Sequence, residues 1–409
     1  MGAKLPDVGR RTTTLLFIVG IVIAWYVYVP VPNDFEEPWK LRLVETTGRT
    51  IRHLAVLGEA LGLGDSVKIA RKLFDIVQQN FLPFGANITM NDTTIDGVTV
   101  RIYRPITMET DQLPAIVFLH GGGWTIGGVR MHHDITKTLS SRLGAVVISV
   151  DYRLAPENIF PAAVDDCLAV TKWVLRHGLQ LKINTQRVAI MGDSAGGNMA
   201  AAISQILTEE KFSPPLKFQV LVYPSLQAID LRLPSYQLDV AAMPAGRTVM
   251  ALFTSFYIKG YMDENFMEEM ENGSLVPHDD ETAIYFSYVD PASLPQEFLP
   301  VDFKRHQPTD VNLTEWNSVK HILLNNKFSP LLKHDLRGLP PAYIVTVKFD
   351  VLTDEAILYS QRLHKADVPA ILKYYRHGFH GCFNLHEIPG FRVSREIMED
   401  FLLYAAEHL

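Results

Sequence analysis

Two glycine-rich runs, each directly after a short apolar stretch, constrain the fold of this chain more than any other feature. Residues 192–196 read Gly-Asp-Ser-Ala-Gly, and residues 120–123 read His-Gly-Gly-Gly. The first run has the Gly-x-Ser-x-Gly spacing of a nucleophile elbow, a sharp turn between a strand and a helix that presents a serine. The second run can supply the oxyanion hole for the same serine. In this order, the two runs predict a serine hydrolase that attacks a carbonyl carbon.

The residues around the elbow fit this prediction. Apolar residues 188–191 predict a buried strand, and the small residues 197–203 predict a helix. Ser194 would then lie at the carboxyl end of the strand, near a helix N-terminus that favours developing negative charge. The alternative is a phosphate-binding loop, but the sequence has neither a Walker lysine after this run nor a Gly-x-Gly-x-x-Gly pattern. We therefore favour the nucleophile.

The glycines that follow the apolar run 115–119 predict the oxyanion donors. Acyl transfer places negative charge on the former carbonyl oxygen, and preorganised backbone N–H groups stabilise that charge. We assign Gly121 and Gly122 as donors, with the Ala195 N–H group as the third. His120 is a tempting general base, but its place at a strand end before the loop favours a role in orienting that loop.

The acid and the histidine of a triad should follow the serine along the chain. Asp350 stands just past a late strand-like run, and Asp354 and Glu355 are close rivals at the start of a helical run. A turn at the carboxyl end of a strand suits an acid that orients an imidazole. His377 and His380 both follow the last strand-like run, and spacing alone does not choose between them.

Three motifs together resemble the hormone-sensitive lipase family of α/β-hydrolases. They are the runs at 120–123 and 192–197, and Asp-Tyr-Arg-Leu-Ala-Pro-Glu at 151–157. Within that family the chain is most similar to the arylacetamide deacetylase group, over nearly its whole length. The resemblance implies Asp350 as the acid and His380 as the base, because they match the group's Phe-Asp-x-Leu and Gly-Phe-His-Gly runs. The implied two-step acyl transfer requires no cofactor and no metal.

The order of apolar runs predicts the α/β-hydrolase fold. Strand-like and helix-like stretches alternate, which favours a mostly parallel central sheet flanked by helices. The connection between residues 224 and 341 is too long for a simple loop, so we expect a helical cap inserted at about 228–335 and completed by the amphipathic residues 44–77. The expected strands are residues 98–103, 115–119, 145–150, 188–191, 218–223, 342–347 and 371–375.

The N-terminus predicts a single transmembrane signal-anchor. Lys4, Arg10 and Arg11 precede an apolar segment, residues 12–31, which approaches the ~20 residues needed to cross hydrocarbon. The positively charged end should stay cytosolic. A cleaved secretory signal is the competing interpretation, but bulky residues occupy the place where a cleavage site with small residues would be expected.

The rest of the chain should then face a lumen. The expected organisation is a cytosolic N-terminus at 1–11, the anchor at 12–31, N-terminal cap or linker helices at 32–85 and the catalytic domain at 86–409. The resemblance implies a type II protein of the endoplasmic reticulum membrane with a lumenal catalytic domain. Four glycosylation sequons agree with this orientation, at Asn87, Asn91, Asn272 and Asn312.

Composition agrees with a globular enzyme behind an anchor. The chain has 409 residues, of which 47% are hydrophobic, which is ample for one large core. Its net charge of −7 gives no indication of nucleic-acid binding. Only two cysteines occur, Cys167 and Cys382, which excludes a disulfide framework and a Cys-rich metal site. Nothing in the sequence specifies an oligomeric state.

Three functions are consistent with these motifs. The first is an esterase or amidase for small lipophilic esters and aryl amides, including xenobiotics. The second is a lipase that acts on acylglycerols or cholesteryl esters at the membrane. The third is a catalytically silent lumenal binding protein on a hydrolase scaffold, against which the intact triad and oxyanion run argue. The expected partners are a small ester, amide or lipid substrate and, through the N-terminal helix, the membrane.

Overall fold

One mixed sheet forms the centre of the molecule. The structure is a computed structural model that describes residues 8–79, 87–106, 112–237, 246–300, 303 and 310–409. Within these residues eight strands lie in the order β1-β2-β4-β3-β5-β6-β7-β8. They are β1 Ile88–Ile95, β2 Val98–Pro105, β3 Leu113–Leu119, β4 Val146–Val150, β5 Ile183–Asp193, β6 Gln219–Val222, β7 Ala342–Phe349 and β8 Ala370–Phe379.

The sheet is parallel from β4 to β8, and β1 and β2 extend it as antiparallel strands. All seven strand runs expected from the sequence belong to it. The additional strand, β1, has a mostly exposed and polar side-chain pattern, because it lies at the edge and has only β2 as a neighbour. Such a strand gives no apolar run, and the sequence analysis missed it.

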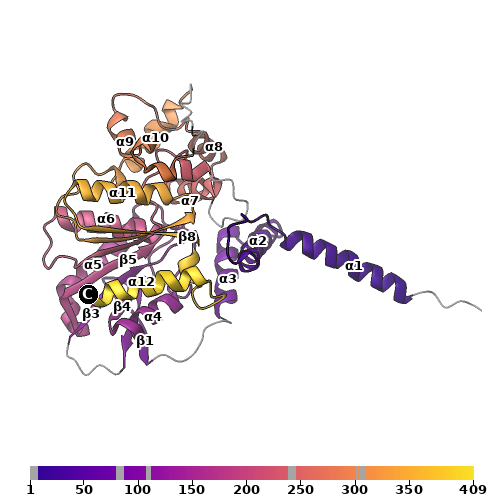
Figure 1. Cartoon of the computed structure of the whole chain (residues 1–409), viewed down its shortest axis with the longest axis horizontal. Coiled ribbons are helices and arrows are strands. Elements are labelled where there is room, and N and C mark those ends of the chain that lie inside the picture. The colour runs from indigo at the N-terminus through magenta and orange to yellow at the C-terminus, as the bar shows by residue number, and fades with distance from the viewer. Residues whose placement is uncertain (1–7, 80–86, 107–111, 238–245, 301–302, 304–309) are drawn as a thin grey trace, which may run out of the picture.

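Helices cover both faces of the sheet, as the α/β-hydrolase fold requires (Figure 1). Alternate residues of β3 divide between two hydrophobic clusters, Ile116 and Phe118 in one and Ala115 and Val117 in the other. The first cluster includes residues of α4 (His133–Leu143) and α12 (Arg392–His408), and the second includes residues of α5 (Ala162–His177), α6 (Ala195–Glu209) and α11 (Thr353–Lys365).

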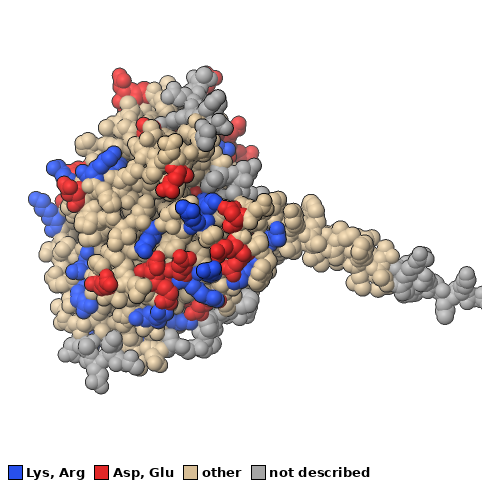
Figure 2. All heavy atoms as spheres, in the orientation of Figure 1, with Lys and Arg blue, Asp and Glu red and all other residues tan. Residues whose placement is uncertain are grey.

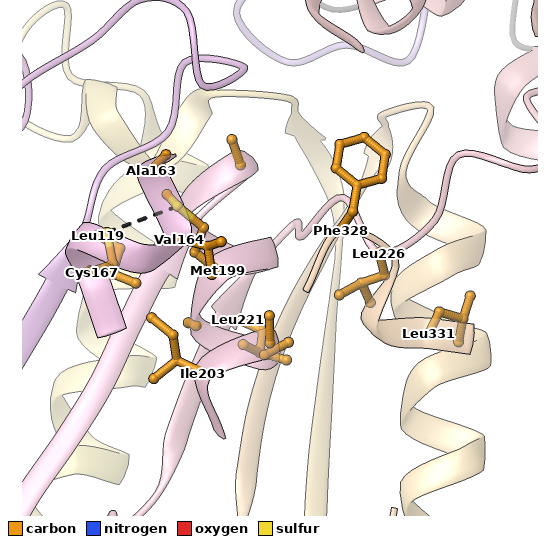
Figure 3. Close-up of a cluster of buried hydrophobic side chains, with 14 of the residues drawn as sticks. Leu119, Ala163, Val164, Cys167, Met199, Ile203, Leu221, Leu226, Phe328 and Leu331 are labelled. Carbon is orange, nitrogen blue, oxygen red and sulfur yellow. Dashed lines mark hydrogen bonds between the residues drawn. The ribbon is translucent and has the colours of Figure 1, made fainter. Parts of the chain in front are cut away.

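The second cluster contains one of the two cysteines. Cys167 of α5 lies with its sulfur 3.9 Å from the sulfur of Met199 in α6 (Figure 3). Cys382, in the short turn η6 (Cys382–Leu385) after β8, is also buried. Both cysteines are free. Burial raises the pKa of the Cys382 thiol to about 12, which keeps it protonated and unreactive at neutral pH.

A long helical segment separates β6 from β7. It contains η2 (Pro234–Gln237), α7 (Arg247–Lys259), α8 (Glu264–Asn272), α9 (Ala283–Tyr288), η3 (Pro291–Ser293), η4 (Gln296–Phe298), α10 (Leu313–Leu323) and η5 (Pro330–Leu332). In Figure 1 α8, α9 and α10 lie above α6 and α11, and α7 lies beside the end of α11. A further turn, η1 (Gly178–Leu181), follows α5.

Three helices precede the sheet. They are α1 (Val8–Val27), α2 (Pro38–Ala60) and α3 (Ser66–Gln79). α1 projects away from the body at the place where α2 and α3 lie (Figure 1). In the part of the chain that the structure describes, no helix combines the length and the apolar character that crossing a membrane requires.

Candidate active site

Three side chains from distant parts of the chain form a hydrogen-bonded line. The Nε2 atom of His380 lies 3.0 Å from the Ser194 hydroxyl oxygen, and its Nδ1 atom lies 2.8 Å from a carboxylate oxygen of Asp350. Each of the three follows the last residue of a strand, since β5, β7 and β8 end at Asp193, Phe349 and Phe379. The carboxyl ends of parallel strands meet at one edge of a sheet, which is why these residues converge.

Ser194 occupies the strained turn of a nucleophile elbow. Its φ of 55° and ψ of −119° are unusual for a residue with a side chain, and they aim the hydroxyl away from both strand and helix. The turn is tight because Gly196 passes next to β3. A Cβ atom at Gly196 would lie 2.0 Å from the carbonyl oxygen of Leu119, so only glycine fits there.

The two rival acids point elsewhere. A carboxylate oxygen of Asp354 accepts a hydrogen bond from the Ser235 N–H group at 2.7 Å. Glu355 accepts hydrogen bonds from the Leu226 N–H group at 2.5 Å and from the Tyr236 hydroxyl at 2.7 Å. Burial raises the pKa of Asp354 to about 6 and that of Glu355 to about 7. These carboxyls hold the segment after β6 against the start of α11.

The two histidines also separate clearly. His377 is exposed, and its Nε2 atom lies 3.6 Å from Glu36. His380 is nearly buried and contacts both Ser194 and Asp350. Burial alone would lower the pKa of His380, but the charge and hydrogen bond of Asp350 outweigh burial and raise it above its ordinary value. The geometry therefore stabilises an imidazolium, the form that His380 would take after accepting a proton.

The loop after β3 corrects one expected oxyanion donor. The Gly121 N–H group donates to a carboxylate oxygen of Asp193 at 2.9 Å, so it is already occupied and cannot also serve the oxyanion. The N–H groups of Gly122 and Gly123 have no acceptor among the described residues. Ala195 is the first residue of α6, where a backbone N–H has no partner within the helix. The backbone N–H groups that remain available for an oxyanion in this loop and at the start of α6 are those of Gly122, Gly123 and Ala195.

Asp193 belongs to a second buried pair that sequence reasoning missed. The Nε2 atom of His132 lies 3.2 Å from one of its carboxylate oxygens, and the Asn384 side-chain amide donates to the other at 3.1 Å. Burial would raise the pKa of Asp193, but the charge of His132 and these hydrogen bonds outweigh it and lower the pKa. An ionised Asp193 therefore anchors the Gly121 N–H group and fixes the start of the oxyanion loop.

His120 does not reach the candidate nucleophile. Its ring is fully buried and stacks on Tyr152 with centroids 4.1 Å apart, and its Nδ1 atom lies 2.9 Å from the Gly121 carbonyl oxygen. Burial and the nearby His132 lower the pKa of His120 to about 3, so it is neutral at physiological pH. These contacts favour the loop-orienting role.

Arg71 of α3 joins the oxyanion loop to the run at 151–157. Its guanidinium donates to the carbonyl oxygen of Thr125 at 2.7 Å and to both carboxylate oxygens of Glu157 at 2.9 Å, and it also contacts the Ala155 carbonyl oxygen. A bidentate pair of this kind fixes orientation as well as distance. A residue in the N-terminal helices therefore helps to hold the loop beside Ser194.

Aromatic side chains of the segment between β6 and β7 contact the loop after β3. Trp124, in the oxyanion loop, stacks on Tyr257 of α7 with centroids 4.8 Å apart and on Phe328 at 5.5 Å. Phe253 of α7 lies so close to Gly123 that a Cβ atom there would stand 2.2 Å from its ring. Ser194 itself is only 9% exposed. These contacts pack apolar side chains of the segment between β6 and β7 against the loop that carries Gly122 and Gly123.

The four sequon asparagines all lie at the surface of the described structure. Asn87 immediately precedes β1 and Asn91 lies within it, at the free edge of the sheet. Asn272 ends α8, and Asn312 caps α10 by accepting a hydrogen bond from the Glu315 N–H group. The described residues contain no group of three or more His, Cys, Asp or Glu side chains arranged to hold a metal ion.

Comparison with known families and proteins gives one consistent result. A family model described as the alpha/beta hydrolase fold matches residues 116–325 and 305–384. The chain is 36% identical to arylacetamide deacetylase from Bos taurus over 391 residues, covering 93% of this chain and 96% of that protein. It is 33% identical to neutral cholesterol ester hydrolase 1 from Rattus norvegicus over 413 residues, covering 98% of this chain and 100% of that protein.

Solved structures of esterases share the fold. A hyperthermophilic esterase from Pyrobaculum calidifontis superposes with a TM-score of 0.62 at 26% identity, covering 88% of this chain and 96% of that one. A thermostable esterase from Pseudomonas putida superposes with a TM-score of 0.64 at 24% identity, covering 89% of this chain and 96% of that one. The second likeness is informative for the fold alone.

Proposed function

Because this chain belongs to the alpha/beta hydrolase family that includes arylacetamide deacetylase and neutral cholesterol ester hydrolase, and is a serine esterase of that family, we propose that Ser194, His380 and Asp350 are its catalytic triad. The observation that carries the assignment is the line of hydrogen bonds from Ser194 through His380 to Asp350. We propose small lipophilic esters and aryl amides as its substrates.

The mechanism proceeds by acyl transfer in two steps. As the Ser194 oxygen attacks the substrate carbonyl, its proton passes to His380 Nε2, and Asp350 stabilises the resulting imidazolium. The N–H groups of Gly122, Gly123 and Ala195 bind the oxyanion. His380 then protonates the leaving alcohol or amine. Water, deprotonated by the same histidine, attacks the acyl-enzyme, and the acid leaves as Ser194 regains its proton.

The segment at about 228–335, together with the N-terminal helices at 32–85, acts in this proposal as a cap over the acyl pocket. Its support is the contact between α7 and the oxyanion loop, through Trp124, Tyr257 and Phe253. An apolar lining of this kind suits aryl or acyl groups.

A second candidate function is hydrolysis of neutral lipids, either acylglycerols or cholesteryl esters. It is favoured by the similarity to neutral cholesterol ester hydrolase 1 and by the aromatic contact between the loop after β3 and α7. The two functions differ in acyl length. Hydrolysis rates for p-nitrophenyl esters from acetate to palmitate, set beside an aryl acetamide and a cholesteryl ester, separate them. Highest kcat/KM for acetyl substrates supports the first function, and a preference for long chains supports the second.

We also propose that residues 12–31 anchor the chain in the endoplasmic reticulum membrane, with the body in the lumen. α1 supports this anchor, because apolar side chains such as Leu16, Phe17 and Ile23 are more than half exposed on it. Residues 12–27 of this helix include no Asp, Glu, Lys or Arg, whereas charges of both signs are interspersed over the visible face of the body (Figure 2). Deglycosylation of protein from microsomes should increase its gel mobility, and Asn→Gln changes at Asn87, Asn91, Asn272 and Asn312 should abolish that shift.

A fluorophosphonate probe tests the triad, because it reacts covalently with an activated serine. Wild-type protein in membranes should label, and Ser194→Ala and His380→Ala should not. His377→Ala is the matched control and should label like wild type, since His377 contacts Glu36 rather than the triad. Absence of labelling in folded wild-type protein would instead favour a silent binding protein.

A further inference from the structure

An apolar stripe runs along the outer face of α2. Five large apolar side chains form it, and they are between 47% and 66% exposed: Trp39, Leu43, Leu54, Leu57 and Leu61. Trp39 and Leu43 are four positions apart at one end of the helix, and Leu54, Leu57 and Leu61 are three or four positions apart at the other end. At about 100° per residue, all five lie on one face of the helix. Over that helix length the stripe extends about 33 Å.

The opposite face of α2 is already packed. Leu41, Ile51 and Ala55 are at most 3% exposed, and Leu41 belongs to the hydrophobic cluster that includes α12. α2 therefore has two apolar faces, one against the body and one open. A soluble surface normally carries polar residues at such positions, and a contiguous exposed apolar patch usually marks an interaction site.

The end of α1 lies on the open face. The Tyr26 hydroxyl is 3.3 Å from the Thr50 hydroxyl and 3.1 Å from His53 Nδ1, and Thr50 lies on the same helix face as Leu43, Leu54 and Leu57. In Figure 1 α1 is seen along its length, whereas α2 is strongly foreshortened, so α2 runs across the direction of α1. The stripe is thus continuous with the place where the proposed anchor meets the body.

Charge distribution fits the same interpretation. Between Trp39 and Leu61, the polar residues on the open face are threonines and His53, with no Asp, Glu, Lys or Arg among them. Cations border one side of the stripe, and two of them, Arg42 and Arg49, lie over the rings of Tyr28 and Tyr26 at 5.2 Å. Apolar side chains flanked by arginines and tyrosines are typical of a helix at the interface between lipid and water.

From these contacts we infer that α2 lies in the membrane–water interface with its stripe in the lipid, so that the enzyme rests on the bilayer through two elements, α1 and α2. The inference rests on the proposed membrane anchor and goes beyond it, because an anchor alone would leave the body free to move on its tether. The occupant is phospholipid of the leaflet from which α1 emerges.

Spin labels on single introduced cysteines test this placement in the full-length protein. Leu57→Cys and Leu61→Cys report on the stripe, and Ile18→Cys reports on the anchor. Leu403→Cys is the matched control, because Leu403 of α12 is a leucine with comparable exposure (68%) and lies outside the stripe. The native thiols are buried and should not label. The protein is placed in nanodiscs of phosphatidylcholine and phosphatidylserine, and unchanged melting temperatures establish that each variant folds.

Relaxation by oxygen, which concentrates in lipid, is compared with relaxation by a water-soluble nickel chelate. We expect labels at residues 18, 57 and 61 to respond more to oxygen, and the label at residue 403 to respond more to nickel. If residues 57 and 61 behave like residue 403 while residue 18 lies in lipid, the inference is wrong and the anchor stands. If residue 18 also lies in water, both fail. A third outcome is that the labels at 57 and 61 are shielded from both reagents and show spin–spin coupling to labels on a second protein molecule. That outcome would show that a second copy of the chain covers the stripe, and it would overturn the inference.

Discussion

Two buried histidine–aspartate pairs stand beside Ser194, and they have different consequences. In the first, His380 lies 2.8 Å from Asp350 and 3.0 Å from the Ser194 hydroxyl oxygen. In the second, His132 lies 3.2 Å from Asp193. The two pairs have the same chemical groups and similar burial. They differ in what surrounds them, because the free nitrogen of His380 meets a hydroxyl, whereas the nearest acceptor to the Nδ1 atom of His132 is the Gly128 carbonyl oxygen at 3.4 Å.

The difference shows that a histidine–carboxylate pair is not itself a catalytic unit. The charge of Asp350 raises the pKa of His380, which in the proposed mechanism takes a proton from Ser194. Asp193 uses its charge to hold a backbone N–H group of the oxyanion loop. In the proposed mechanism the first pair moves a proton, whereas the second holds the loop after β3 in position. Four substitutions test this division of roles.

Removal of the His380 imidazole should have the largest effect. His380→Ala should lower kcat for p-nitrophenyl acetate by about 10⁵–10⁶-fold, because Ser194 loses its base. His377→Ala, in the same segment, should stay within about twofold of wild type because that side chain is exposed. Similar losses in both variants would contradict the assignment.

Loss of the charge on Asp350 should come next. Asp350→Asn should lower kcat by about 10⁴-fold, since the amide favours the wrong tautomer of His380. It should also change the pH profile. In wild type, kcat/KM should fall as the pH decreases through the pKa of His380, which Asp350 raises above the ordinary value of 6.5. Without that charge, the fall of kcat/KM should move to lower pH. If it stays at the wild-type pH, a group other than His380 controls it.

Truncation of Asp193 should have an intermediate effect. Asp193→Ala frees the Gly121 N–H group and leaves His132 buried without its carboxylate, so kcat should fall by about 10²-fold as the oxyanion donors lose their positions. Asp193→Asn keeps an acceptor for Gly121 and should restore most of the rate. If both variants lose activity equally, the charge rather than the loop anchor is what matters.

Substitution of His132 should have the smallest effect. His132→Gln retains a polar group towards Asp193, so kcat should fall by less than about tenfold, the range expected for one hydrogen bond. The fall of kcat/KM at low pH should occur at the same pH in His132→Gln as in wild type, because His380 remains the titrating base. A displaced limb would assign His132 a direct part in proton transfer, and the distinction between the two pairs would fail.

The sequence predicted those features that depend on short, local patterns. Apolar runs gave seven of the strands, and the spacing around Ser194 gave the elbow. Choosing His380 over His377 needed the family resemblance, because both follow the same apolar run at 371–375; in the structure His377 lies within β8 and only His380 follows that strand. The fold class is confirmed by the family match and the sheet order. The cellular location stays a prediction.

What sequence reasoning missed depends on contacts between residues far apart in the chain. Gly121 looked free as a donor, but a carboxylate 72 positions away takes its N–H group. The Asp193 side chain is the variable position of the elbow motif, so its type alone carried no signal. Arg71 lies 54 positions before the carbonyl it binds in the oxyanion loop. No local periodicity encodes such pairs, and only the packed structure reveals them.

The hydrogen bonds of Arg71 also define where a soluble version of this enzyme can begin. A fragment that starts at the first strand would omit α3 and, with it, the guanidinium that joins Thr125 to Glu157. Such a fragment would keep Ser194, His380 and Asp350 and still lose a restraint on the loop that receives the oxyanion. A fully active fragment should therefore begin before α3, and one that begins at residue 32 removes only the cytosolic N-terminus and the proposed anchor.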